Sequence, residues 1–418
     1  IICTKMKKSK VILYAFVAAF GALVVGLNLG GISGAIDIIE KEFALSSLAK
    51  GLVASALMVG CLVGALTGGR LSDKFGRRPL MMASAALLAI SAAGCSLLSN
   101  GAAALVAFRF VGGLGVGVLS AVIPTYITEI SPEKMRGTLV SLYQLFVVIG
   151  ILAAYVANYF LVGFDGNWHW MLGFPLVFAL IDIILLLFLP ESPLWLTQRN
   201  HKRQAEAKLS ELFKGKMAKV VFLGCMLAFF QQITGINVVI NYAPGILGKV
   251  GIAGSDPMLQ TVFVGAANLL FTIIALWLCD KFGRKTLLVS GCAGLVLSLG
   301  YLTYAFSIEN PSNVGILVAI LAYIAFFALS LSPLMFVVTS EMYPSHIRGT
   351  AMALSTGISW VCAFLVVQFY PWMESTLGAN VTFGIFGVLC LLAGLFIHFF
   401  IPETKGKKLE DIERELGL

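Results

Sequence analysis

The sequence has 418 residues, of which 59% are hydrophobic and 12% charged, with a mean hydropathy of +0.94. Soluble domains carry roughly 45–50% apolar and about 25% charged residues, so a soluble enzyme, a secreted disulfide scaffold and a disordered protein are excluded. The formal net charge is +8, which alone would suit a nucleic-acid partner. The composition instead fits a chain that crosses a lipid bilayer many times.

Twelve apolar stretches are each long enough to cross a bilayer. They predict an all-α integral membrane protein with twelve transmembrane helices. The stretches are 11–34, 48–68, 79–98, 102–124, 139–162, 168–189, 218–248, 259–279, 286–306, 313–338, 350–372 and 380–401.

The positions of Lys and Arg along the chain predict its orientation. If the N-terminus is cytoplasmic, 25 of the 29 Lys and Arg residues fall on cytoplasmic segments, and outside loops hold Lys41, Lys50 and Lys249. The remaining cation, Arg109, falls inside a predicted helix. This bias predicts a multi-pass protein of the cell membrane with both termini cytoplasmic. It also explains the positive charge without a nucleic-acid partner.

The chain repeats itself. The segment Glu129-Ile-Ser-Pro-Glu-Lys-Met-Arg-Gly-Thr recurs 212 residues later as Glu341-Met-Tyr-Pro-Ser-His-Ile-Arg-Gly-Thr. The repeat predicts two homologous six-helix halves, 1–196 and 218–401, joined by a cytoplasmic linker, 197–217, and followed by a cytoplasmic tail, 402–418. This architecture is typical of transporters, in which the substrate binds between the halves near the membrane midplane.

Charged residues recur at the helix ends that we expect to be cytoplasmic, where acids and arginines can pair. We interpret them as a latch that holds these ends together in one conformation and separates in another. The alternative is that they are ordinary interfacial charges that anchor the topology. The set comprises Asp73, Arg77, Arg78, Glu129, Arg136, Glu191, Asp280, Arg284, Glu341, Arg348 and Glu403.

Five features together resemble the sugar porter family of the major facilitator superfamily: the Asp-Lys-Phe-Gly-Arg loops, the Arg-Gly repeats, Pro190-Glu-Ser-Pro193, Gln231-Gln-Ile-Thr-Gly-Ile-Asn237 and Pro402-Glu-Thr-Lys-Gly406. The resemblance extends from Gly26 to Glu413. It implies alternating-access transport of a monosaccharide, with a hexose such as glucose as the expected substrate. We expect a monomer that is not an enzyme and uses no cofactor or metal.

Neutral amides suit sugar recognition, because Gln and Asn offer both a donor and an acceptor to each hydroxyl, while aromatic faces cover the apolar side of the ring. Gly235 and Pro244 predict a broken helix that lets Gln231 and Asn237 converge. The alternative is that the amides only hold helices together. By the resemblance, the sugar contacts Gln144, Gln231, Gln232, Asn237, Asn268, Phe327, Phe336 and Trp360, and an outer gate contains Asn241 and Tyr242.

Several positions depart from the family pattern, and three of them bear on the sugar site and the latch. Phe336 stands where the family usually has Trp, Ser359 where it usually has Asn, and Leu194 where it commonly has Arg. The first two leave the sugar preference open, and the third removes one cation from the latch.

Helix one carries Gly26-Leu-Asn28, where proton-coupled members of the family have Gly-Tyr-Asp. Asn28 and Arg109 have similar predicted depths and can meet. Because an Asn does not titrate, we predict facilitated diffusion. The rival is a symporter that uses Asp182 of helix six, although we expect a snorkelling or helix-packing role for that acid. A sugar sensor of the same fold and a drug or organic-ion exporter are the remaining alternatives.

Overall fold

The computed structural model describes residues 7–132, 135–198, 215–250, 256–308, 312–344, 347–405, 407 and 414. The regular structure of these residues is helical. Within them, twelve helical spans are long and apolar enough to cross a membrane. The predicted all-α fold with twelve transmembrane helices is confirmed. The predicted linker lies mostly outside the described residues, so the proposed boundaries between the halves stay a prediction.

The chain forms two compact units, and the first comprises Ile1–Gln204 together with Ile240–Tyr242. Its helices are α1 (Lys8–Glu42), α2 (Ser47–Phe75), α3 (Arg77–Ala93), the π-helical η2 (Gly94–Leu98), α4 (Ala102–Ile130), α5 (Arg136–Leu161), α6 (Asn167–Gly173), α7 (Pro175–Leu187) and α8 (Pro193–Gln198).

The second unit comprises Ala205–Val239 and Ala243–Leu418. Its helices are α9 (Gly215–Ile233), α10 (Ile236–Val250, apart from Ile240–Tyr242), α11 (Pro257–Lys281), α12 (Arg284–Ala305), α13 (Asn313–Leu329), α14 (Leu331–Met342), α15 (Arg348–Leu377) and α16 (Ala379–Phe400).

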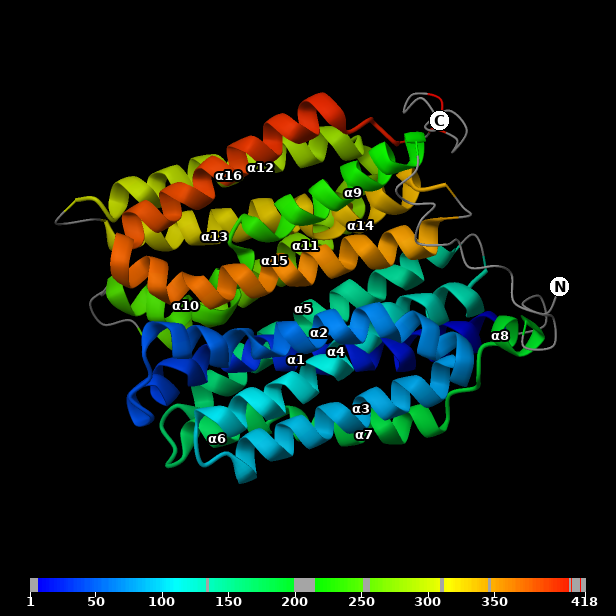
Figure 1. Ribbon diagram of the computed structural model, residues 1–418, viewed down its shortest axis with the longest axis horizontal. Helices are drawn as coiled ribbons and strands as arrows, with labels where there is room; N and C mark the ends of the chain where they lie inside the picture. Colours follow the sequence, from blue (N-terminus) through cyan, green and yellow to red (C-terminus); the bar gives the residue numbers. More distant parts are fainter. Residues whose placement is uncertain are drawn as a thin grey trace. The chain divides into compact units, whose positions relative to one another are not determined.

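Helices pair in the same way in both units. In the first unit α1 packs against α5, α2 against α4, and α3 against α7. In the second unit the corresponding pairs are α9 with α15, α11 with α13, and α12 with α16 (Figure 1). The first and fifth, second and fourth, and third and sixth spans are therefore neighbours in each unit, as an internal sequence repeat requires.

Glycines allow α2 and α4 to approach backbone to backbone. A Cβ at Gly60 of α2 would meet the carbonyl oxygen of Phe110 and lie 2.8 Å from Cα of Gly113 on α4. Gly64 and Gly117 repeat this close approach one turn further along. Inside a membrane no hydrophobic effect drives helices together, so such close van der Waals packing supplies much of their association.

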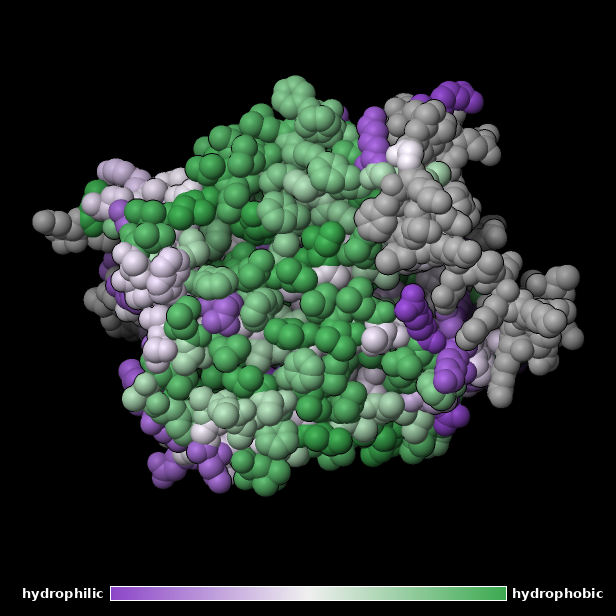
Figure 2. Space-filling view, in the orientation of Figure 1, coloured by the Kyte–Doolittle hydropathy of each residue, from purple (hydrophilic) through white to green (hydrophobic). Residues whose placement is uncertain are grey.

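The outward faces of the helices are apolar, as a membrane-spanning protein requires. Figure 2 shows hydrophobic residues over much of the visible helical surface. Large apolar side chains are exposed there, including Leu97 on η2, Phe188 after α7 and Leu297 on α12. In water this surface would promote aggregation, whereas lipid tails cover it at no cost.

Two spans are broken in the second unit. The seventh breaks between α9 and α10 at Thr234 and Gly235, and Gly235 has φ +93°, a backbone conformation that favours glycine. The predicted broken helix is confirmed at Gly235, whereas α10 continues through Pro244, which the sequence also suggested as part of the break. The tenth span breaks at Ser330 between α13 and α14, which the sequence analysis treats as one helix.

We expect Gly60→Ala to destabilise the protein by about 1–3 kcal/mol, because its Cβ would push α2 away from α4. Gly69→Ala in the same helix is the matched control, since Gly69 is exposed and its Cβ would contact nothing within 4 Å. The control should be neutral or stabilising by up to about 1 kcal/mol. Thermal unfolding in detergent measures both, and equal midpoints would contradict the close-packing argument.

Candidate functional site

A cluster of polar side chains lies at the break between α9 and α10, and we call Gln231, Gln232, Asn237 and Ser359 the amide cluster. Gln232 is its centre. Its Nε2 donates to Oγ of Ser359 on α15 at 2.8 Å and to Oε1 of Gln231 at 3.3 Å. Its Oε1 accepts from Nδ2 of Asn237 at 2.5 Å. The break therefore brings together amides that a straight helix would place about 120° apart around its axis.

Hydrogen bonds to main-chain carbonyls beside the two helix breaks hold the amide cluster and its surroundings in place. Nε2 of Gln231 donates to the carbonyl of Leu331, the first residue of α14, at 3.3 Å. The hydroxyl of Tyr323 on α13 donates to the carbonyl of Thr234 at 3.0 Å. Gln231 and Ser359 are buried, while Gln232 and Asn237 are half-buried and therefore still accessible.

The other predicted sugar contacts are distributed over several helices. Gln144 on α5 of the first unit, Asn268 on α11 and Trp360 on α15 are half-buried, and Phe327 on α13 is buried. Phe336 on α14 is 42% exposed. The predicted gate residues, Asn241 and Tyr242, are both buried on α10.

The predicted sugar contacts omit Ser359, Tyr323 and Leu331. Ser359 precedes Trp360, and its place in the family pattern was a usable signal. Leu331 and Tyr323 act through a backbone carbonyl and a long-range hydrogen bond, which leave no local trace in a sequence.

Asn28 of α1 and Arg109 of α4 line one small cavity in the first unit, together with Ser91, Cys95 and Pro175. Their predicted proximity is thus seen in the structure. Nδ2 of Asn28 donates to the carbonyl of Val24 at 2.9 Å, and Nη2 of Arg109 donates to the carbonyl of Ala54 at 3.0 Å. Both side chains are at least nine-tenths buried.

Asp182 on α7 is completely buried, and neither of its carboxylate oxygens has a hydrogen-bond partner among the described residues. A Cβ at Gly21 of α1 would lie 3.2 Å from Oδ2 of Asp182, so the carboxyl packs against α1. Of the two roles predicted for Asp182, snorkelling is therefore wrong, and the contact with α1 agrees with the other, helix packing. The sixth span lies against α1 and α3, and its inward face includes this acid.

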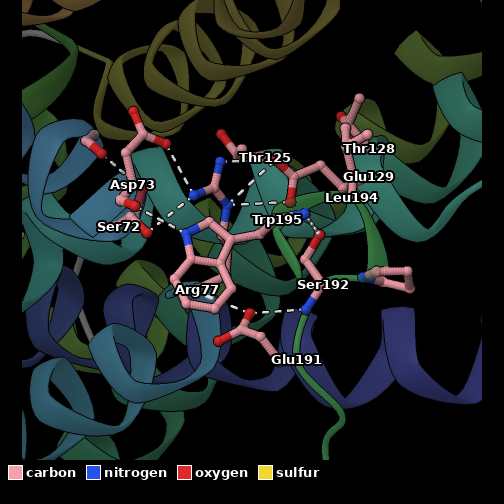
Figure 3. A network of polar contacts seen from close by, with 12 residues as sticks. Ser72, Asp73, Arg77, Thr125, Thr128, Glu129, Glu191, Ser192, Leu194 and Trp195 are labelled. Carbon is pink, nitrogen blue, oxygen red and sulfur yellow. Dashed lines mark hydrogen bonds and ion pairs between the residues drawn. The ribbon is translucent and has the colours of Figure 1, made fainter. Parts of the chain in front are cut away.

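A charge network connects four segments of the first unit at the end that carries the Asp-Lys-Phe-Gly-Arg loop (Figure 3). Arg77 is its centre, and its side chain is 6% exposed. The Arg77 guanidinium pairs with Glu129 at 2.8 Å and with Asp73 at 2.9 Å, and it also donates to the carbonyl of Ser72. The indole of Trp195 donates to the carbonyl of Asp73.

Glu191 and Glu403 hold the N-termini of two helices. Glu191 accepts from the main-chain N–H groups of Arg77 and Arg78, the first residues of α3, at 3.0 and 3.2 Å. In the second unit, Glu403 accepts from the N–H groups of Arg284 and Lys285 at the start of α12, at 2.8 and 3.1 Å. Each carboxylate satisfies helix donors that have no partner within the helix and lies at the positive end of the helix dipole.

The remaining latch residues occupy different surroundings. The guanidinium of Arg284 pairs with Glu341 at 3.4 Å. The Arg78 guanidinium donates to the carbonyls of Leu186 and Leu187. The Arg348 guanidinium donates to the carbonyl of Tyr343. Arg136 is exposed at the start of α5. The side chain of Asp280 lies outside what the structure describes. Whether the set separates during transport stays a prediction.

Two six-helix units with paired spans, a broken span and polar side chains at the break define a membrane transporter. The family described as "Sugar (and other) transporter" matches residues 14–218 and 200–416. The chain belongs to this family, the sugar porters of the major facilitator superfamily. It is a multi-pass sugar transporter and not an enzyme.

Relatives cover nearly the whole chain. It is 36% identical to an arabinose-proton symporter of Bacillus subtilis, over 97% of this chain and 94% of the relative. It is 35% identical to the glucose transporter GlcP of Staphylococcus epidermidis, over 98% of each. Among solved structures, the inward open xylose transporter XylE from Escherichia coli is similar, with a TM-score of 0.84, 32% identity and coverage of 97% of this chain and 99% of that one.

Burial of the Glu403 carboxyl opposes its ionisation, but hydrogen bonds from the N–H groups of Lys405, Arg284 and Lys285 outweigh this and hold the pKa of Glu403 below its usual range. A depressed pKa in the folded state contributes stability above the unfolded-state pKa. That contribution is lost as the pH falls through the folded-state pKa.

We therefore expect Glu403→Gln to lower the unfolding midpoint at pH 7, with a loss of about 1 kcal/mol, as for other carboxylates that cap helix N-termini. The gap between variant and parent should narrow as the pH falls below the usual range of a glutamate, because the parent then loses its charge. Unfolding in detergent between pH 3 and 8 measures the gap. A gap that does not change over this range would contradict the assigned role.

Proposed function

We propose that this protein carries a monosaccharide across the cell membrane by alternating access, with a hexose such as glucose as its substrate. The amide cluster is the observation that carries the proposal. Four neutral polar side chains from α9, α10 and α15 converge there, two of them half-buried. Neutral amides bind sugar hydroxyls as both donors and acceptors without the desolvation cost of a charge. Both termini are cytoplasmic and the transporter works as a monomer in this proposal.

Sugar binding uses the break between α9 and α10. The amide–amide bonds of Gln232 are exchanged for bonds to sugar hydroxyls, each worth roughly 0.5–1.5 kcal/mol. Because the cluster spans the break, the sugar links Asn237 on α10 to Gln232 on α9. Gly235 supplies the backbone freedom for α10 to change direction relative to α9. A sugar that binds both sides of the break can thereby favour one conformation of α10 over another.

Gln232→Ala should weaken hexose binding about tenfold or more, because at least two neutral hydrogen bonds are lost. Gln368→Ala is the matched control, since nine helical residues place Gln368 on the opposite face of α15 from Ser359. Equilibrium binding of labelled glucose and uptake into proteoliposomes measure both variants. Uptake by Gln232→Ala within twofold of the parent would remove the amide cluster from the sugar site.

We further propose that transport is facilitated diffusion. The position beside Arg109 holds Asn28, whose side-chain amide does not titrate and so cannot carry a coupled proton. Uptake by the parent should therefore stop when the sugar concentrations are equal and should not respond to a proton gradient.

Asn28→Asp would place a titratable carboxyl in the cavity that Arg109 lines. We expect net uptake by this variant to become pH-dependent, because protonation of the new acid is linked to the conformation that binds sugar. Exchange between two sugar-filled sides should change less. Proteoliposome assays with and without an imposed proton gradient measure both modes. Accumulation by the unmodified protein, driven by external acid, would overturn facilitated diffusion.

The second candidate is a proton-coupled symporter that uses Asp182. The two carboxylate oxygens of Asp182 are buried and have no hydrogen-bond partner in the part of the chain that the structure describes, and an ionised carboxylate in such a place is costly. The arabinose and xylose relatives are themselves named as proton symporters. If the parent accumulates sugar, Asp182→Asn is the deciding variant, since loss of accumulation with binding retained would assign the proton to Asp182.

A further inference from the structure

Arg109 is a buried cation without an acidic partner. Its side chain belongs to α4, the residue is 4% exposed, and no ion pair to it occurs among the described residues. One of its nitrogens, Nη2, donates to a main-chain carbonyl, and Nε has no hydrogen-bond partner within the described ranges. A dipole from one carbonyl does not balance a full charge in a medium of low dielectric constant.

The cavity beside Arg109 is chemically suited to a negative charge. It has a volume of about 10 Å³, and Asn28, Ser91, Cys95 and Arg109 supply its polar lining. An amide, a hydroxyl and a thiol can each donate a hydrogen bond. No carboxylate is among the residues that line it. The lining therefore combines one full positive charge with neutral donors.

The helices around the cavity are shaped to leave this space. Cys95 lies in the π-helical segment η2, which forms the end of the third span. Single π-helical turns occur frequently at functional sites. Gly112 on α4 faces Ser91, and a Cβ there would press on the Ser91 side chain. These features keep the polar lining at a defined position.

The buried acid of the same unit is too far away to serve as the counter-ion. Asp182 lies seven residues after Pro175, which lines the cavity, and this is about 10 Å along a helix. Asp182 packs against Gly21 of α1. Gly21 precedes Asn28, which lines the cavity, by seven residues, so the separation along α1 is also about 10 Å. A counter-ion for Arg109 would therefore have to enter the cavity from solution.

We propose that this cavity binds a small monovalent anion such as chloride, with Arg109 as its counter-charge and Asn28 and Ser91 as neutral donors. The anion replaces the fixed negative charge that the chain lacks at position 28. About 10 Å³ of the cavity is open to the centre of a water-sized sphere. This leaves room for a monatomic anion and excludes large anions such as gluconate. The proposal does not depend on which sugar is carried.

The experiment compares the thermal unfolding midpoint in sodium chloride with that in sodium gluconate, at equal ionic strength and without sugar. We expect the unmodified protein to unfold about 2 °C or more higher in chloride, because an anion that binds only the folded state stabilises it. Binding of radioactive chloride to the purified protein should be saturable. Because no sugar is present, the result is independent of the transport assays.

Two variants separate a specific site from a general salt effect. Asn28→Asp supplies a carboxylate that can pair with Arg109 at neutral pH, and Arg109→Gln removes the positive charge, so either variant should lose the chloride dependence at pH 7. Asp182→Asn changes a buried charge outside the cavity and should retain it. Identical midpoints of the unmodified protein in the two salts, or a chloride effect that persists in Asn28→Asp or Arg109→Gln, would overturn the proposal and assign the cavity to water.

Discussion

A polar group inside a lipid bilayer must find its partner within the protein, and this constraint determines where the helices of this chain can break. Interrupting a helix frees carbonyl and N–H groups that water cannot reach. At the break between α9 and α10, the freed carbonyl of Thr234 accepts from Tyr323. Beside the second break, Gln231 donates to the carbonyl of Leu331, the first residue of α14. The two broken spans are therefore joined by a side chain from each, and the amide cluster lies where they meet.

Main-chain groups also need partners at the helix ends, where carboxylates accept hydrogen bonds from the free N–H groups. Glu191 follows α7 and binds the start of α3, while Glu403 follows α16 and binds the start of α12. In each unit the chain after the sixth span is thus tied to the loop between the second and third. Arg77 adds α4 to this connection through Glu129. A six-helix unit fastened in this way can move as one body, as alternating access requires.

The sequence allowed the twelve spans, their repeat and the break at Gly235 to be predicted, because these depend on local signals. Apolar length predicts a span, and a glycine near polar residues predicts a break. The residues of the amide cluster on α9 and α10 are close in sequence, so their convergence could also be inferred. Ser359 joins them from 122 residues beyond Asn237, and only packing in three dimensions determines that contact.

The tenth span shows the limit of such signals. Its break at Ser330 is followed by Pro333, which fits the first turn of a new helix because its missing N–H is not needed there. The sequence contains that signal, but a proline within a long apolar run is also compatible with a kinked helix. Asp182 shows the same limit at another position. An acid in a span expected to be peripheral is compatible with snorkelling or with helix packing, and only the packing of α7 on α1 shows that the acid is buried.

Arg109 and Asp182 together explain why the first unit is electrically unusual. The unit holds a buried cation and a buried carboxylate, and the structure does not pair them. Two unlike charges that formed a salt bridge would cancel each other within the protein, and neither would respond to the solution. Kept apart, each must be balanced where it lies, because the cost of an isolated buried ion exceeds what marginal stability allows. A halide beside Arg109 and a proton on Asp182 would achieve this balance. The halide comes from solution, so the charge balance at Arg109 would depend on the salt that surrounds the protein.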